Sequence, residues 1–248
     1  MRKLLILCFI FPALCVAASS SSIPTNQENG QRDLEKKILI SNDNKEIAIS
    51  HLARGDAHLQ NGELEIAISA FDKALTLDNS LDIALLHRAL AYGYNKQHEN
   101  AITDLNEYIK RNPKSSLAYT KRGLNNLQID NVFEAVKDYQ RAIELDKNNA
   151  EAHDDLGVIY VQSGKLDKAI NYFRVALLID PEYIQAWHNI AMANLIKGKH
   201  DTALEQVDRA LALRSDDANA LLLKSVILES MGEIELALKY KKLATELQ

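Results

Sequence analysis

The amino-acid sequence predicts an all-α fold in which antiparallel helix pairs stack into a solenoid. The main observation is a period of 34 residues that runs from Ala48 to the end of the chain without an insertion. Self-similarity at a fixed period of this length is typical of solenoids, whose repeats bury their apolar faces only by stacking. The composition agrees, because the chain is 47% apolar and 25% charged and holds only four prolines, so uninterrupted helices are possible.

Three columns of mostly small residues carry the period. The first column is alanine in every repeat: Ala67, Ala101, Ala135, Ala169, Ala203 and Ala237. The second column consists of Ala74, Tyr108, Ala142, Ala176, Ala210 and Ala244. The third column consists of Gly55, Ala89, Gly123, Gly157, Ala191 and Ser225. Small side chains let two helix backbones approach closely, so each repeat is expected to be one pair of helices, with apolar residues at helical spacing on both.

The fourth repeat carries the motif that makes a family resemblance visible. It holds Leu156, Gly157, Tyr160, Ala169, Phe173, Ala176 and Pro181, and the fifth repeat supplies an aromatic opening residue, Trp187. In this order and spacing, the pattern resembles the tetratricopeptide repeat family over residues 48–248. The resemblance implies a right-handed superhelix of antiparallel helix pairs. It also implies a concave groove that is lined by the first helix of each repeat and binds protein segments.

The N-terminus has the pattern of a secretory signal peptide over residues 1–18. Arg2 and Lys3 are followed by an apolar run too short to be a permanent membrane span, and Val16 and Ala18 fit the small-x-small cleavage pattern. An uncleaved anchor is the alternative. Residues 19–44 are rich in serine and asparagine and are expected to be a polar linker. The repeat array is expected over residues 45–248, with its repeats at 48–81, 82–115, 116–149, 150–183, 184–217 and 218–248.

Charge and cysteine content narrow the compartment and the partners. Both cysteines, Cys8 and Cys15, lie inside the predicted signal, so the exported chain would hold no disulfide and no thiolate metal site. Cleavage removes two basic residues and no acidic one, which takes the formal charge from −5 to −7. This charge disfavours nucleic acid or an anionic membrane as a partner. We therefore expect a periplasmic or secreted protein of bacterial origin, with no stable membrane span after cleavage.

Arginine replaces the family's usual leucine in the first three repeats, at Arg54, Arg88 and Arg122. Sixteen residues after the second and third of these stand Asp104 and Asp138. Where the arginine position is apolar again, in the fourth and fifth repeats, the aspartate is absent as well. Because a partly buried guanidinium needs a carboxylate, the pattern predicts two structural ion pairs, Arg88 with Asp104 and Arg122 with Asp138.

No arrangement of residues typical of catalysis is recognisable. His98 and Glu99 begin like a zinc-protease motif, but an isoleucine stands where the second histidine should be. Ser230 has no base partner that the sequence identifies. Asp154 and Asp155 are interpreted as residues of a helix start and a solvated face. We expect no enzymatic activity, no cofactor and no metal.

The first helices of repeats one to three are apolar, whereas those of the later repeats are more mixed. The predicted groove consists of Leu52, Ile83, Leu86, Leu90, Leu117, Thr120, Leu124, Leu127, Asp154, Val158, Val161, His188 and Met192. Soluble monomers seldom leave so large an apolar patch uncovered. Such stripes are also common between packed helices, and for each residue that interpretation stays open.

The sequence thus predicts a non-catalytic scaffold or adaptor that binds a protein or peptide segment in the groove of repeats one to three. Three covers for the groove are considered: a partner segment, a second copy of the chain, or the apolar island at residues 38–40 folding back. The alternative function is a self-assembling structural protein whose groove is a homo-oligomer interface.

Overall fold

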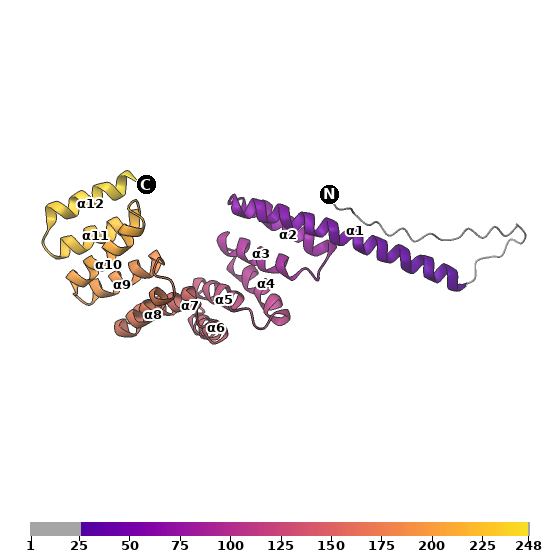
Figure 1. Ribbon diagram of the computed structural model, residues 1–248, viewed down its shortest axis with the longest axis horizontal. Helices are drawn as coiled ribbons and strands as arrows, with labels where there is room; N and C mark the ends of the chain where they lie inside the picture. The colour runs from indigo at the N-terminus through magenta and orange to yellow at the C-terminus, as the bar shows by residue number, and fades with distance from the viewer. Residues whose placement is uncertain (1–25, 248) are drawn as a thin grey trace, which may run out of the picture. The chain divides into compact units, whose positions relative to one another are not determined.

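The computed structural model describes residues 26–247, and all regular secondary structure in this range is α-helical (Figure 1). The prediction of an all-α fold is confirmed. The predicted signal peptide, residues 1–18, lies outside the described residues. The chain divides into two compact units, Met1–Asn44 and Lys45–Gln248, and the second unit contains the six repeats.

Each repeat supplies two helices, and their order follows the chain. The bounds are α1 Asn26–Gln60, α2 Leu64–Leu77, α3 Asp82–Tyr94, α4 His98–Arg111, α5 Ser116–Gln128, α6 Val132–Leu145, α7 Ala150–Gln162, α8 Leu166–Ile179, α9 Ile184–Ile196, α10 His200–Leu213, α11 Ala218–Ser230 and α12 Ile234–Glu246. The odd-numbered helix is the first of its repeat and the even-numbered helix the second.

The packing of the array follows the repeat. From α2 to α12, each helix contacts the next one along the chain. The first helices of successive repeats also touch, from α3 through α5, α7 and α9 to α11. Among the described residues no second helix contacts the second helix of a neighbouring repeat in this way. The odd-numbered helices therefore form one continuous layer, and a partner that lies across the repeats would meet this layer.

Each helix pair turns through one residue in the left-handed backbone region. The six residues and their φ angles are Gly62 at 74°, Lys96 at 59°, Asp130 at 61°, Gly164 at 72°, Gly198 at 71° and Gly232 at 86°. Glycine takes this conformation without a steric penalty because it has no Cβ. Lys96 and Asp130 carry a Cβ at the same turn, so the second and third repeats hold a strained residue where the others do not.

Glycine inside the first helices has a different role, which is close packing. A Cβ on Gly157 would lie 2.3 Å from Cε1 of Phe173, and one on Gly55 would lie 2.4 Å from Cε1 of Phe71. Both phenylalanines are fully buried. The aromatic ring of the second helix therefore occupies the space that a side chain on the first helix would need.

α1 begins at Asn26, so residues 26–44, which were predicted to belong to a polar linker, are helical. Leu34 and Leu39 in this segment are 58% and 63% exposed. The composition of polar and turn-forming residues suggested a linker, but once the first repeat nucleates a helix, adding residues such as Lys36 and Lys37 costs little. None of the described helices has the length and apolarity needed to cross a bilayer.

The last helix is only partly polar on its outer side. Lys239, Lys241 and Lys242 are exposed. However, Leu238 is 61% exposed and Leu243 39% exposed on the same helix. The end of the array thus presents apolar surface among its lysines.

Candidate functional site: a pocket between repeats two and three

A pocket of about 470 Å³ lies against the layer of first helices, between repeats two and three. Its apolar floor is made by Leu90 of α3 and Leu124 of α5, both half-buried. Tyr94, one helical turn after Leu90, is 64% exposed beside them. The volume is in the range that takes a small ligand or a few peptide residues. We call this site the Leu90–Leu124 pocket; Gly93, Lys96, His98, Lys121, Asn125 and Gln128 complete its lining.

A polar network fixes the wall of this pocket. His98 Nδ1 and Asn125 Oδ1 lie 2.9 Å apart, and Asn125 Nδ2 donates to the carbonyl oxygen of Lys121 at 2.8 Å. Asn125 is 95% buried, so both ends of its amide are held without water. Gly93 makes this possible, because a Cβ there would lie 3.1 Å from Asn125 Oδ1. The wall is therefore pre-formed by contacts between α3, α4 and α5.

Two lysines give the pocket its charge. Lys121 Nζ contacts Glu151 Oε1 of α7 at 2.6 Å, which fixes the ammonium at the edge of the pocket. Lys96 is exposed and makes no ion pair with any side chain that the structure describes. None of the described side chains that line the pocket is a carboxylate. The pocket is thus apolar at its floor and basic at its rim.

The predicted groove residues fall into three groups. Leu90 and Leu124 line the pocket, and Ile83, Leu117 and Met192 are 38%, 45% and 37% exposed on the same layer of helices. The second group packs half-buried against the core clusters: Leu52, Leu127, Val158 and Val161. His188 is also half-buried, and burial lowers the pKa of its ring.

The third group corrects the groove prediction. Leu86, Thr120 and Asp154 are at most 4% exposed and cannot present a side chain to a partner. Leu86 belongs to the core between α3, α4 and α5. Thr120 Oγ1 donates to the carbonyl oxygen of Ser116 and accepts from Asn149 Nδ2 at 2.8 Å. Helical spacing alone does not separate these positions from the exposed ones, because the next repeat covers them.

Arginine and aspartate meet where the sequence pairs them. Arg88 donates from Nε and Nη2 to the two carboxylate oxygens of Asp104, both at 2.7 Å. Arg122 binds Asp138 in the same two-pronged way, at 2.9 and 2.6 Å. The hydrogen bond with Asp104 raises the pKa of Arg88 further above its ordinary value. Both carboxylates are buried, so each would be an uncompensated charge without its arginine.

The Nη1 group of each arginine donates to a side chain of the previous repeat, a contact that the sequence analysis did not predict. Arg88 Nη1 donates to Asp72 Oδ1 at 2.6 Å, and Arg122 Nη1 donates to Asn106 Oδ1 at 2.7 Å. Asp72 and Asn106 each stand sixteen residues before their arginine. A polar residue sixteen positions before each arginine could therefore have indicated this contact, just as the aspartate sixteen positions after it indicated the ion pair. Each guanidinium thus joins the two helices of its own repeat to the second helix of the repeat before.

A second structural correction concerns Asp154 and Asp155, which do not lie on a solvated face. Asp154 is 2% exposed, and Asn189 Nδ2 of α9 lies 3.1 and 2.9 Å from its two carboxylate oxygens. Burial raises the pKa of Asp154 to about 6, against the effect of the Asn189 hydrogen bond. Burial, followed by the charges of Glu151 and Asp154, raises the pKa of Asp155 to about 7. The fourth repeat therefore contains two carboxyl groups that titrate near neutral pH.

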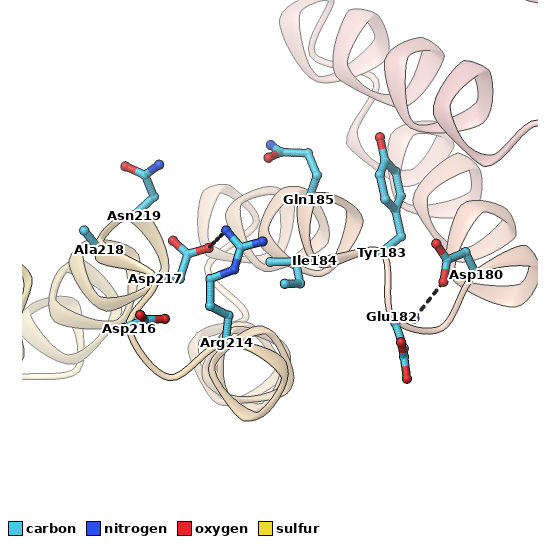
Figure 2. Close-up of a pocket in the computed structure, with 10 residues that line it drawn as sticks. All are labelled: Asp180, Glu182, Tyr183, Ile184, Gln185, Arg214, Asp216, Asp217, Ala218 and Asn219. Atoms are coloured by element: carbon cyan, nitrogen blue, oxygen red, sulfur yellow. Dashed lines mark hydrogen bonds and ion pairs between the residues drawn. The ribbon is translucent and has the colours of Figure 1, made fainter. Parts of the chain in front are cut away.

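A second hollow of about 590 Å³ lies between the α8–α9 and α10–α11 loops (Figure 2). Its lining is acidic, and two of its four carboxylates, those of Asp180 and Asp217, hold the loops in place. Glu182 donates its backbone N–H to Asp180 Oδ1 at 3.0 Å, and Asp217 Oδ1 accepts the N–H of Ala220 as the N-cap of α11. Arg214 reaches toward Asp217, with 3.9 Å between Nη1 and Oδ2. These contacts fix the shape of the two loops.

One serine does have a histidine partner, contrary to the expectation for Ser230. Its hydroxyl lies 2.8 Å from Nδ1 of His200. The same hydroxyl also lies 2.6 Å from the carbonyl oxygen of Ile227, as serines at helix ends commonly do. Among the carboxylates that the structure describes, none forms an ion pair with His200, so none of them orients this imidazole as the acid of a hydrolytic triad does.

Comparisons with known proteins agree with the architecture. Models of the tetratricopeptide repeat match residues 37–82, 83–115, 150–183 and 189–246, and a further model of the same repeat matches residues 132–164. A small glutamine-rich tetratricopeptide repeat-containing protein of Dictyostelium discoideum is 38% identical over 79 residues, which are 32% of this chain and 24% of that protein. The aligned region thus spans about a quarter of that curated relative.

Solved structures give the same result. The protein MamA is 30% identical with a TM-score of 0.56, over 70% of this chain and 94% of MamA. YrrB, described as a tetratricopeptide protein with an unusual peptide-binding site, is 27% identical with a TM-score of 0.53, over 73% of this chain and 93% of YrrB. The Cut9–Hcn1 structure has a TM-score of 0.76 over 86% of this chain and 43% of the other, but at 23% identity it shows the fold alone.

The stacked helix pairs define an α-solenoid of the kind whose repeats generally serve as modules for protein interaction. The chain belongs to the tetratricopeptide repeat family.

Proposed function

We propose that this protein is a non-catalytic scaffold that binds a segment of another protein at the layer of first helices in repeats one to three. The observation that carries the proposal is the Leu90–Leu124 pocket, where two half-buried leucines and an exposed tyrosine form an apolar floor. Ile83 and Leu117 extend this apolar surface on the same helices. Surfaces with large apolar side chains in a pre-formed hollow are typical of peptide-binding sites. The peptide-binding site attributed to YrrB, a relative with the same repeats, supports this choice.

Polar substitution of the pocket floor tests the proposal. The variant carrying Leu90→Asp and Leu124→Asp places two carboxylates where an apolar side chain would bind. Capture of the partner by the purified protein should be lost, while the helical circular dichroism stays unchanged because both leucines are only half-buried. As a control, Phe133→Asp changes an exposed side chain (71%) on the second helix of repeat three. Capture that survives the double substitution would move the site elsewhere.

We also propose that the chain is exported to the periplasm or cell envelope through cleavage of residues 1–18. The basic start, short apolar run and small residues before position 19 support this. Mass spectrometry of the intact protein purified from the periplasmic fraction of a bacterial host should give the mass of residues 19–248. Recovery of the full-length chain in the membrane fraction would instead indicate a retained anchor.

The alternative function is a self-assembling protein whose apolar helix layer binds a second copy. Ile83 and Leu117, which are 38% and 45% exposed on that layer, favour it, because a second copy could cover the same apolar surface. Multi-angle light scattering over a hundredfold concentration range separates the two functions. A monomer that is independent of concentration supports the scaffold, and growth with concentration supports self-assembly.

A further inference from the structure

The rim of the Leu90–Leu124 pocket differs in charge from the chain that carries it. The whole chain holds 34 acidic and 29 basic residues. The described lining of this pocket includes Lys96, His98 and Lys121 and no carboxylate. The hollow between the later repeats has the opposite character, with four carboxylates and one arginine in its lining. The two hollows therefore carry charge of opposite sign.

We propose that the Leu90–Leu124 pocket binds an extended peptide segment in which a large apolar side chain is flanked by carboxylates. This inference rests on the proposed function and names the chemistry of the partner. The apolar side chain lies on Leu90 and Leu124, beside the ring of Tyr94. The carboxylates lie at the two lysines of the rim.

The lysines can accept such a ligand. Lys121 uses one of the three N–H donors of its ammonium on Glu151, so donors remain for a second carboxylate. The Lys121 side chain is 19% exposed and is held in position, which lowers the entropic cost of binding. Lys96 is exposed and forms no ion pair with the described side chains, so its charge can meet a ligand. Glu151 repels an acidic ligand at one edge, which places the closest carboxylate on the Lys96 side.

The turn at Lys96 also offers a clean variant. Lys96→Gly removes the charge and relieves a left-handed backbone, so the protein should not lose stability. Asp130→Gly is the matched control, because Asp130 has the same φ region at the same turn of the next repeat and does not line the pocket. Both variants should raise the melting temperature, but only the first changes the pocket.

The test is fluorescence anisotropy with end-capped six-residue peptides and residues 19–248 of the protein. The first peptide carries a central Leu-Phe pair flanked on each side by two aspartates. The second has asparagine for aspartate, the third lysine for aspartate, and the fourth serine for Leu-Phe. Capping both ends excludes binding through a terminal carboxylate.

The acidic peptide should bind. The dissociation constants of the asparagine, lysine and serine peptides should each be higher by about threefold to tenfold. Lys96→Gly should weaken the acidic peptide by a similar factor and leave the asparagine peptide unchanged, and Asp130→Gly should alter neither. Higher salt should reduce the difference between the two peptides.

Equal binding of the acidic and asparagine peptides, or an acidic peptide that is indifferent to Lys96→Gly, would overturn the inference. If those peptides bind equally and the Leu90→Asp, Leu124→Asp variant binds neither, the proposed function stands and only the charge preference fails. If no peptide binds and the double variant still captures its partner, both fail. Binding that disappears only as the chain oligomerises would identify a second copy as the occupant and contradict an external segment.

Discussion

At the scale of single residues, the small side chain in the middle of the first helix is matched in size to the side chain that faces it from the second helix of the same repeat. Gly157 faces Phe173, and the equivalent position of the second repeat pairs Ala89 with Leu105. Where the second helix supplies a large ring, the first has no Cβ, and where it supplies an aliphatic side chain, the first carries alanine. The fold therefore depends on pairs of residues and not on the small residue alone.

Gly157→Ala should consequently lower the free energy of unfolding, by about 1–2 kcal/mol after the gain in helix propensity is taken into account. The added methyl group would lie 2.3 Å from Phe173, so the ring must move. Adding Phe173→Leu should restore most of the loss, because that pair reproduces the second repeat. Urea unfolding of the two single variants and the double variant measures this. Costs that simply add would show that the two side chains do not compete for one space.

The buried carboxyl group of Asp154 makes the free energy of unfolding depend on pH. Its folded pKa is raised to about 6 from 3.8, so the folded state favours the protonated form. The protonated carboxyl therefore contributes its full stabilisation of the folded state below about pH 4, and this contribution is lost as the pH rises through 6. Asp154→Asn should therefore raise the free energy of unfolding at pH 7.5 by about 1–2 kcal/mol, since no buried charge remains.

The gain of Asp154→Asn should disappear at pH 4, where the wild-type carboxyl is protonated as well. His188, whose pKa is lowered by burial, acts in the opposite direction in both proteins and cancels in the comparison. The control is Glu205→Gln, a change at an exposed carboxylate. A stability difference that stays the same from pH 4 to pH 7.5 would mean that Asp154 is not charged at a cost in the folded protein.

At the scale of helices, the sequence predicts the helix pairs of the repeats well, but it does not predict where the first helix begins. The columns of alanine locate every helix pair from α2 to α12, because small residues recur only where backbones approach. The helix that leads into the first repeat was missed, since residues 26–44 lack the column and their asparagines and Gly30 suggested a loop. Propagation from an existing helix does not require the repeat pattern.

The arginines show what connects one helix pair to the next. Each of Arg88 and Arg122 contacts a carboxylate sixteen residues ahead and a polar group sixteen residues behind. Lys224 repeats this geometry in the last repeat, with Asp208 behind it at 2.6 Å and the ring of Tyr240 ahead. A cation at this position therefore ties three helices together, and the apolar Leu156 of the fourth repeat does so by packing.

A double substitution that copies the fourth repeat tests whether the ion pair is replaceable. Asp138→Tyr or Arg122→Leu alone should each cost about 3 kcal/mol of stability, because each leaves a buried group without its partner. Together they should cost less than either, since they install the apolar pair found at Leu156 and Tyr172. Chemical denaturation of all four proteins measures the coupling. A double variant that is as unstable as the sum would mean that the Asn106 and Asn126 contacts, not the pair itself, dominate.

At the scale of the whole molecule, the sequence predicted the two leucines of the pocket but not the polar residues that line it. Leu90 and Leu124 were predicted because they are equivalent positions of two first helices. Lys96 and His98 were missed because they lie in a turn and on a second helix, which only the packing of α3, α4 and α5 brings to the same hollow. The burial of Asp154 likewise depends on Asn189 of the following repeat.

The central claim is that the repeat layer at Leu90 and Leu124 is the working surface, and site-specific crosslinking tests it most directly. Residues 19–248 contain no cysteine, so in this part of the chain Leu124→Cys carries a photo-crosslinker at the pocket and Phe133→Cys carries the same reagent on the exposed side of α6. We predict that the partner crosslinks to position 124 and not to position 133, and that the acidic Leu-Phe peptide competes with it. Equal crosslinking at both positions, or crosslinking only at 133, would contradict the account.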